Sequence, residues 1–302
     1  MKDIDIKGII VPIITPMHED ESINIEELRR QVRRQIEGGV HAIFCFGTNG
    51  EGYILNAKEK ELVLSTVIDE CAGRVPVYAG TGCVSTRETI EQSRMAMSLG
   101  ADVLSIITPS FAQASQDELY EHYRKVAEAV DMPIVLYNIP ARTGNALAPA
   151  TVGRLAQIDN IVGAKDSSGS FTNILNYINA GKQKKNGRFS VLSGNDQLII
   201  WTLLAGGTGG IAGCANVYPH VMASIYDLYV EGRTEEAMAT NQSIGSFRDC
   251  FRYGNPNTIV KTAVGLLGHD VGSCRAPFCG VSAEGIEALK KVLKENADKG
   301  MC

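Results

Sequence analysis

The stretch Ile161-Val162-Gly163-Ala164-Lys165-Asp166-Ser167-Ser168 places a lysine at the end of a run of small and apolar residues, just before a polar turn. A β-branched run bounded by turn residues predicts a buried strand. Burying an ammonium there costs several kcal/mol unless it is paired or loses its proton. A desolvated lysine is partly neutral and can attack a carbonyl to form a Schiff base. The alternative is a structural lysine that reaches solvent or pairs with Asp166, and the stretch alone leaves both interpretations open.

Lys165 differs in position from the other lysines of the chain. Lys7 precedes a predicted strand, and Lys261 lies in an apolar stretch, residues 258–264, that predicts a helix. The remaining lysines fall on polar helical faces or near the chain end. Lys165 is therefore the lysine that the pattern places at the exit of an apolar strand.

Strand and helix patterns alternate on both sides of this stretch. Besides the Lys165 strand, we predict strands at residues 8–15, 42–46, 75–79, 102–107, 134–137, 189–192 and 209–213. The intervening helices are predicted at residues 24–38, 57–72, 85–99, 116–130, 148–157, 170–181 and 196–205. Parallel strands joined by helices form either an open doubly wound sheet or a closed barrel. Eight repeats favour an α/β fold of the (β/α)8 TIM barrel type over residues 1–230.

Two further observations support this fold class and its boundaries. The open sheet would carry a Gly-x-Gly-x-x-Gly turn after the first strand, where this chain has Pro12-Ile13-Ile14-Thr15-Pro16. Residues 231–302 show helical segments near 233–250, 256–267 and 282–297, with no strand pattern and no linker before them. We expect them to form a C-terminal helical extension packed on the barrel.

Composition excludes several classes of function. The chain has 302 residues and a net charge of −5, which offers no basic footprint for nucleic acid or an anionic membrane. Neither a membrane-spanning run nor a signal peptide is predicted, so we expect a cytoplasmic protein. The eight cysteines, Cys279 and Cys302 among them, form no Cys-x-x-Cys, and no His-Glu-x-x-His occurs. Reduced thiols are expected, with no metal site and no organic cofactor.

In a parallel barrel, the active site lies at the carboxyl ends of the strands. Lys165, Tyr137 and Thr48 all fall at such ends. A lysine nucleophile needs a proton shuttle, which a neighbouring phenol can supply, and the glycine turn at residues 47–52 can bind a small carboxylate. Tyr137 could equally be a core aromatic residue, the turn a tight loop, and Arg142 a surface charge. Their joint placement on one rim with a buried lysine favours a functional site.

Three motifs at these separations resemble those of the dihydrodipicolinate synthase/N-acetylneuraminate lyase family. They are Gly-Thr-Asn-Gly-Glu at residues 47–51, Tyr-Asn-Ile-Pro-Ala-Arg-Thr-Gly at 137–144 and Gly-Ala-Lys-Asp-Ser-Ser-Gly at 163–169. The resemblance covers essentially the whole chain. The family comprises class I lyases and aldolases that hold pyruvate, or another 2-oxo acid, as a Schiff base on a lysine.

The resemblance implies a role for each matching residue. Lys165 would form the Schiff base, and Tyr137 would be the proton shuttle. Thr48 and the amide of Asn49 would bind the carboxylate of the 2-oxo acid. The remaining matches are Gly194 and Ile211, at positions that line the pyruvate pocket, and Arg142, which matches the arginine that binds the semialdehyde carboxylate in the synthases.

Other positions depart from the synthase pattern. Asn49 replaces a second threonine, and Phe111 stands where the synthases present a tyrosine to the neighbouring subunit's site. The Lys-Asp-Ser-Ser segment is more similar to members that act on 2-keto-3-deoxy sugar acids. We therefore expect reversible cleavage of such an acid to pyruvate and an aldehyde. Alternatives are 4-hydroxy-tetrahydrodipicolinate synthase, N-acetylneuraminate lyase-like activity, a related dehydratase or deaminase, and a non-catalytic 2-oxo-acid-binding regulator.

The resemblance also implies a homotetramer built from paired dimers. The loop after the fourth strand would then bring Phe111 into contact with the neighbouring subunit. The alternative is a loop that covers the mouth of its own barrel.

Overall fold

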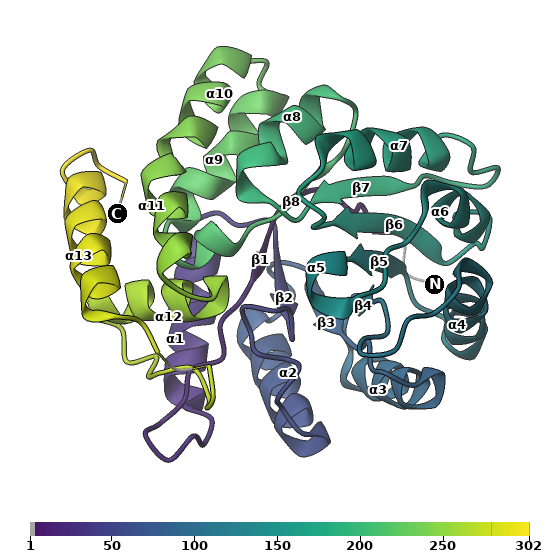
Figure 1. Ribbon diagram of the computed structural model, residues 1–302, viewed down its shortest axis with the longest axis horizontal. Helices are drawn as coiled ribbons and strands as arrows, with labels where there is room; N and C mark the ends of the chain where they lie inside the picture. Colours follow the sequence, from purple (N-terminus) through teal and green to yellow (C-terminus); the bar gives the residue numbers. More distant parts are fainter. Residues whose placement is uncertain (1–3, 279, 302) are drawn as a thin grey trace. The chain divides into compact units, whose positions relative to one another are not determined.

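The computed structural model describes residues 4–278 and 280–301 (Figure 1). Its strands are β1 Gly8–Pro12, β2 Ala42–Cys45, β3 Val77–Gly80, β4 Val103–Ile107, β5 Ile134–Asn138, β6 Ile161–Asp166, β7 Ser190–Ser193 and β8 Gly209–Ile211. They follow one another in sequence order in a closed barrel. The prediction of a (β/α)8 barrel is confirmed.

The helices are α1 Ile25–Glu37, α2 Ala57–Cys71, α3 Thr86–Leu99, α4 Gln116–Ala129, α5 Pro140–Thr143, α6 Pro149–Leu155, α7 Phe171–Gly181, α8 Ile199–Leu204, α9 Pro219–Val230, α10 Thr234–Ser243, α11 Gly245–Asp249, α12 Pro256–Leu266 and α13 Ala283–Ala297. Several of these helices begin at a residue whose side chain accepts a hydrogen bond from an amide of the first turn. Asn56 and Ser115 each form a capping box, with Glu59 and Glu118 respectively.

The chain divides into two compact units. One comprises the described residues of 1–8 together with residues 76–211, and it holds β3 to β8 with α3 to α8. Its sheet core consists of apolar strand residues that solvent does not reach, such as Leu104, Val135 and Ala164. Within this unit, α6 and α7 lie side by side (Figure 1).

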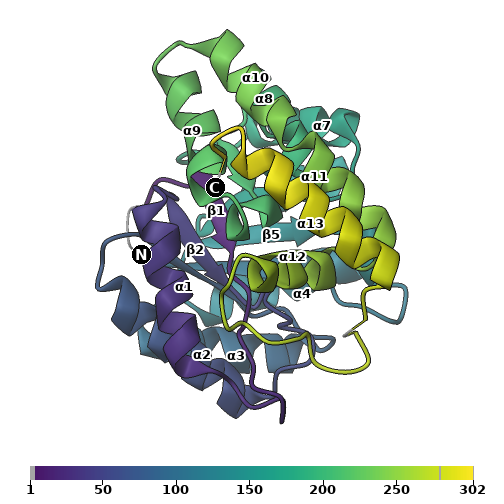
Figure 2. The same ribbon diagram turned by 90° about the vertical axis from the view of Figure 1, so that its left-hand side faces the viewer.

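The second unit comprises residues 9–75 and the described residues of 212–302. It holds most of β1, all of β2, and α1, α2 and α9 to α13. Within it α1 packs against α2, α9 against α10, and α13 against both α11 and α12 (Figure 2). The helices after residue 231 thus share a compact unit with the first two strands. The division into a catalytic barrel, residues 1–230, and a helical extension, residues 231–302, stays a prediction.

The predicted helix at residues 233–250 is wrong as a single element. The chain turns at Ile244 and resumes as the short helix α11, which begins at Gly245. Glycine is a poor helix former, and this explains why the continuous pattern breaks there. Sequence patterns also missed α5 and α9. α9 buries residues on several sides, so its apolar residues give no clear one-sided periodicity.

The first strand is shorter than the predicted residues 8–15. It ends at Pro12, and the amide of Ile14 donates to the side chain of Asn216 over 3.0 Å. The Asn216 amide also donates to the carbonyl of Pro12 over 3.0 Å. A side chain thus satisfies the backbone groups that a continued strand would have bonded.

Candidate active site

Lys165 and Tyr137 occupy directly paired positions on the neighbouring parallel strands β6 and β5. Paired positions place side chains on the same face of a sheet. Both residues are buried, with 4% of Lys165 and 3% of Tyr137 exposed. The Nζ atom of Lys165 lies 3.7 Å from the centre of the Tyr137 ring. The lysine and the aromatic residue singled out in the sequence are therefore in contact.

Asp166 lies on the opposite face of the strand from Lys165, because successive strand side chains alternate. Its carboxylate accepts hydrogen bonds from Asn138 Nδ2 at 2.7 Å, Ser168 Oγ at 2.6 Å and Asn173 Nδ2 at 2.9 Å. These donors are neutral, and Asn173 belongs to α7. The Lys165 side chain is thus buried rather than solvated, and the Asp166 carboxylate is bonded by neutral side chains.

Gly194 follows β7 and lies against the Lys165 side chain. Its amide donates to the Asp166 carbonyl over 2.7 Å. A Cβ atom at this position would come within 2.9 Å of Lys165 Cε and 1.8 Å of Ser167 Oγ. Only glycine fits here without displacing Ser167. The missing side chain also leaves room for the side chain of Lys165. The predicted site position Gly194 is thus beside the lysine.

The other two predicted positions of this unit have different surroundings. Ile211 is the last residue of β8 and is buried. Arg142 lies on the short helix α5, which follows β5, and its side chain is exposed. In the described part of the chain, no hydrogen-bond or ion-pair partner is found for its guanidinium. An exposed guanidinium one short turn after Tyr137 is suited to binding an anionic group.

Thr48 and Asn49 belong to the other compact unit, in the turn that follows β2. The Glu51 amide donates to the Thr48 carbonyl over 3.2 Å, which closes the turn. Thr15 Oγ1 donates to the Gly50 carbonyl over 2.7 Å and fixes the turn to the segment after β1. Both Thr48 and Asn49 are partly exposed. The turn is therefore a defined structure that presents a hydroxyl and an amide.

Phe111 is completely exposed, on the loop between β4 and α4. Its backbone has φ of +78°, a region that aromatic residues rarely adopt. The buried Asn145 side chain holds this loop: it accepts from the Ala114 amide at 2.8 Å and donates to the carbonyls of Pro109 at 2.9 Å and Ala112 at 2.8 Å. The ring thus projects from a loop that is fixed at its base.

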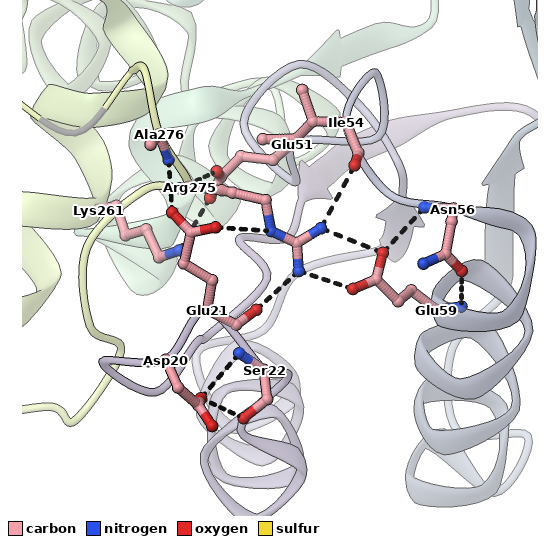
Figure 3. A network of polar contacts seen from close by, with 10 residues as sticks. All are labelled: Asp20, Glu21, Ser22, Glu51, Ile54, Asn56, Glu59, Lys261, Arg275 and Ala276. Carbon is pink, nitrogen blue, oxygen red and sulfur yellow. Dashed lines mark hydrogen bonds and ion pairs between the residues drawn. The ribbon is translucent and has the colours of Figure 1, made fainter.

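Sequence patterns missed a buried ion pair in the second unit (Figure 3). Lys261 Nζ lies 2.8 Å from Glu51 Oε1, and only 1% of the lysine and none of the glutamate side chain is exposed. The sequence did carry a signal for it. A lysine between Ile259-Val260 and Ala263-Val264, in a helix that is apolar on most sides, must find a buried partner.

The described cysteines form no disulfide with one another: Cys45, Cys71, Cys83, Cys214, Cys250 and Cys274. Cys279 and Cys302 lie outside the described residues, as do residues 1–3. Burial, with the charge of Glu51 as a smaller cause, raises the pKa of Cys274 to about 12, so this thiol stays protonated. Among the described residues, no cluster of three potential metal ligands is present, and no helix has the length and apolar character needed to span a bilayer.

Comparison with known proteins places this architecture in a family. The model of the dihydrodipicolinate synthetase family matches residues 5–296. An uncharacterized DapA-like lyase of Halobacterium salinarum is 36% identical over 97% of this chain and 94% of its own length. A 4-hydroxy-tetrahydrodipicolinate synthase of Methanothrix thermoacetophila is 38% identical over 97% of both chains. The structure of YagE, an Escherichia coli K12 prophage protein of this family in complex with pyruvate, superposes with a TM-score of 0.93 at 31% identity, covering 98% of this chain and 99% of that one.

These matches and the closed barrel define an enzyme of the lyase class. The chain belongs to the dihydrodipicolinate synthetase family, whose members are pyruvate-dependent lyases and synthases.

Proposed function

We propose that the protein cleaves a 2-keto-3-deoxy sugar acid reversibly to pyruvate and an aldehyde, through a Schiff base on Lys165. The observation that carries the proposal is the buried Lys165 amine against the ring of Tyr137, on directly paired strand positions. A lysine amine that contacts no bulk water can attack the carbonyl of a bound 2-oxo acid to form a Schiff base. The pyruvate complex of a relative with the same fold supports pyruvate as one reactant.

The proposed chemistry begins when Lys165 Nζ attacks the keto carbon and water leaves to give a protonated imine. A base then removes the proton of the hydroxyl on C4. The carbon–carbon bond between the C3 methylene and C4 breaks. The electrons of that bond move to the imine nitrogen, so that the aldehyde leaves and an enamine of pyruvate remains. Protonation of its methylene carbon and hydrolysis release pyruvate and the free lysine. We assign the proton transfers to Tyr137.

We propose the turn carrying Thr48 and Asn49 as the binding site for the carboxylate of the 2-oxo acid, with Gly194 and Ile211 lining the pyruvate pocket. Thr48→Val keeps the shape of the side chain and removes its hydroxyl. It should weaken pyruvate binding by about 1.5–3 kcal/mol, the value of a hydrogen bond to a charged group. The measurement is the pyruvate concentration that gives half-maximal borohydride trapping. An unchanged concentration would remove Thr48 from the binding site.

A synthase activity on aspartate semialdehyde is the second candidate. Two observations favour it: the exposed guanidinium of Arg142, and relatives at 35–38% identity that carry the synthase name. Against it stand Phe111, which has no hydroxyl for a proton relay, and Asn49 in place of a second threonine. N-acetylneuraminate lyase-like activity and a non-catalytic 2-oxo-acid-binding regulator are the further alternatives.

A panel assay tests the choice between these functions. Cleavage of 2-keto-3-deoxy acids and of N-acetylneuraminate is followed by pyruvate release, and condensation is followed with pyruvate plus aspartate semialdehyde. We expect the fastest turnover with a 2-keto-3-deoxy acid, and we expect Phe111→Tyr to raise condensation with the semialdehyde. High wild-type activity on the semialdehyde, with no gain from Phe111→Tyr, would show that the synthase assignment is correct. Binding of pyruvate with no turnover on any substrate would indicate the regulator.

We also propose a homotetramer in which Phe111 contacts the neighbouring subunit. The support is physical: a fully exposed aromatic ring on a loop fixed by Asn145 is suited to packing against another surface. Sedimentation of a monomer at micromolar concentration would contradict the shared contact. A cytoplasmic location, and function without metal or organic cofactor, stay part of the proposal.

A further inference from the structure

The carboxylate of Glu51 is bonded on both oxygens in the interior of its unit (Figure 3). Oε1 accepts from Lys261 Nζ at 2.8 Å, and Oε2 accepts from the Arg275 amide at 2.8 Å. Lys261 belongs to α12, and Arg275 lies in the segment between α12 and α13. One side chain therefore ties the turn after β2 to two distant parts of the chain.

Glu51 is also the residue that closes the turn carrying Thr48 and Asn49. Its amide donates to the Thr48 carbonyl, and its backbone has φ of +55°, which non-glycine residues rarely adopt. A residue keeps such a backbone only where its surroundings fix it. The two hydrogen bonds at the carboxylate contribute to that fixation, alongside the bond from Thr15 to the Gly50 carbonyl.

The Arg275 side chain extends the same connection to the start of α2. Its guanidinium donates to both oxygens of Glu59, at 2.6 and 3.1 Å, and to the carbonyls of Ile54 at 3.3 Å and Glu21 at 2.7 Å. Glu59 in turn accepts from the Asn56 amide and caps α2. The segment from the turn to α2 is thus held at Glu51 and at Glu59 (Figure 3).

We propose that Lys261 and Glu51 are positioning residues that hold the turn in the conformation that binds the substrate carboxylate. This inference rests on the proposed function, which assigns carboxylate binding to Thr48 and Asn49. A buried ion pair is weak as a source of stability, because well-packed apolar residues of similar volume often replace it without loss. Apolar residues could not orient the Glu51 side chain as this pair does, and that orientation in turn helps to fix the backbone of the turn.

The test measures pyruvate binding separately from the chemistry. The pyruvate concentration for half-maximal borohydride trapping at Lys165 reports affinity, and the labelled fraction at saturation reports Schiff-base formation. For Lys261→Met we expect the half-saturating concentration to rise about 10- to 100-fold, the loss typical of a misdirected hydrogen bond to a charged group. The labelled fraction at saturation should stay at the wild-type level.

Lys184→Met is the matched control. Lys184 is a partly buried lysine, and its Nζ donates to the carbonyl of Ala156 at 2.7 Å and to that of Ile161, at the start of β6, at 3.2 Å. It lies at the strand end opposite to Lys165. Its replacement should lower thermal stability and leave the half-saturating pyruvate concentration unchanged. An equal rise in both variants would show that Lys261 acts only through stability, and would overturn the inference.

Lys261→Met leaves a buried carboxylate without its counter-ion, so the double variant Glu51→Gln/Lys261→Met provides a second test. It removes both charges of this pair, and it should unfold at a higher temperature than Lys261→Met. Its pyruvate affinity should nevertheless stay weakened, because the tie between the turn and α12 is absent. Recovery of wild-type affinity together with stability would overturn the positioning role.

A double-mutant cycle shows whether Lys261 acts through the turn. Thr48→Val should weaken affinity much less in the Lys261→Met background than in the wild type, since the hydroxyl is already misplaced there. Additive losses would mean that Lys261 acts elsewhere, and would contradict the inference. Absence of labelling in the wild type at any pyruvate concentration is a different result, because it rejects the proposed Schiff-base function itself.

Discussion

Lys165→Ala should lower turnover by several orders of magnitude while the protein still folds. In the proposed mechanism the substitution removes the covalent nucleophile, and with it the imine on which the bond cleavage depends. Steady-state assays with the best substrate of the panel measure the loss. Thermal unfolding serves as the control: removing a buried amine that contacts Tyr137 should not abolish the cooperative transition.

Lys184→Ala is a matched comparison for this prediction, since it removes a partly buried lysine whose Nζ bonds to the Ile161 carbonyl, at the other end of β6 from Lys165. It should retain turnover close to that of the wild type. Turnover of Lys165→Ala within roughly tenfold of the wild type would contradict a covalent mechanism at this residue.

Tyr137→Phe should lower turnover by about 10²–10⁴-fold, the usual contribution of general acid–base catalysis. The variant keeps the ring that lies 3.7 Å from Lys165 Nζ and removes only the hydroxyl, so the packing around the lysine should persist. Pyruvate affinity should change much less than turnover. The measurement combines the maximal rate with the half-saturating pyruvate concentration from trapping.

A different outcome would reassign Tyr137. If turnover stays near that of the wild type, the residue serves only as an aromatic wall for the lysine. If affinity and turnover fall by the same factor, the hydroxyl contributes to ground-state binding rather than to proton transfer.

Sequence patterns predicted the elements that repeat and the residues that end strands. Lys165 and Tyr137 could be placed on one rim because the carboxyl ends of parallel strands share one end of a barrel. Their contact follows from the register that pairs them, which the pattern does not contain but the barrel imposes. Gly194 was found through the resemblance, and its role as the position that leaves space for Lys165 became visible only in three dimensions.

Other features depend on contacts between distant residues. Glu51 and Lys261 are far apart in sequence, so the apolar surroundings of Lys261 indicate that it is buried but do not identify its partner. Asn145 holds the Phe111 loop through backbone groups, which carry no sequence signal. The break between α10 and α11 at Gly245, and the short helix α5, each depend on one or a few residues. A hydrophobic periodicity averaged over a longer window does not detect them.

Borohydride trapping on the wild-type enzyme tests the central claim most directly. The protein is incubated with pyruvate, reduced with borohydride, digested and analysed by mass spectrometry. We predict that one reduced pyruvyl group is added and that it resides on the peptide containing Lys165, with no label on Lys165→Ala. Label on a different lysine, or no label at saturating pyruvate, would contradict the account.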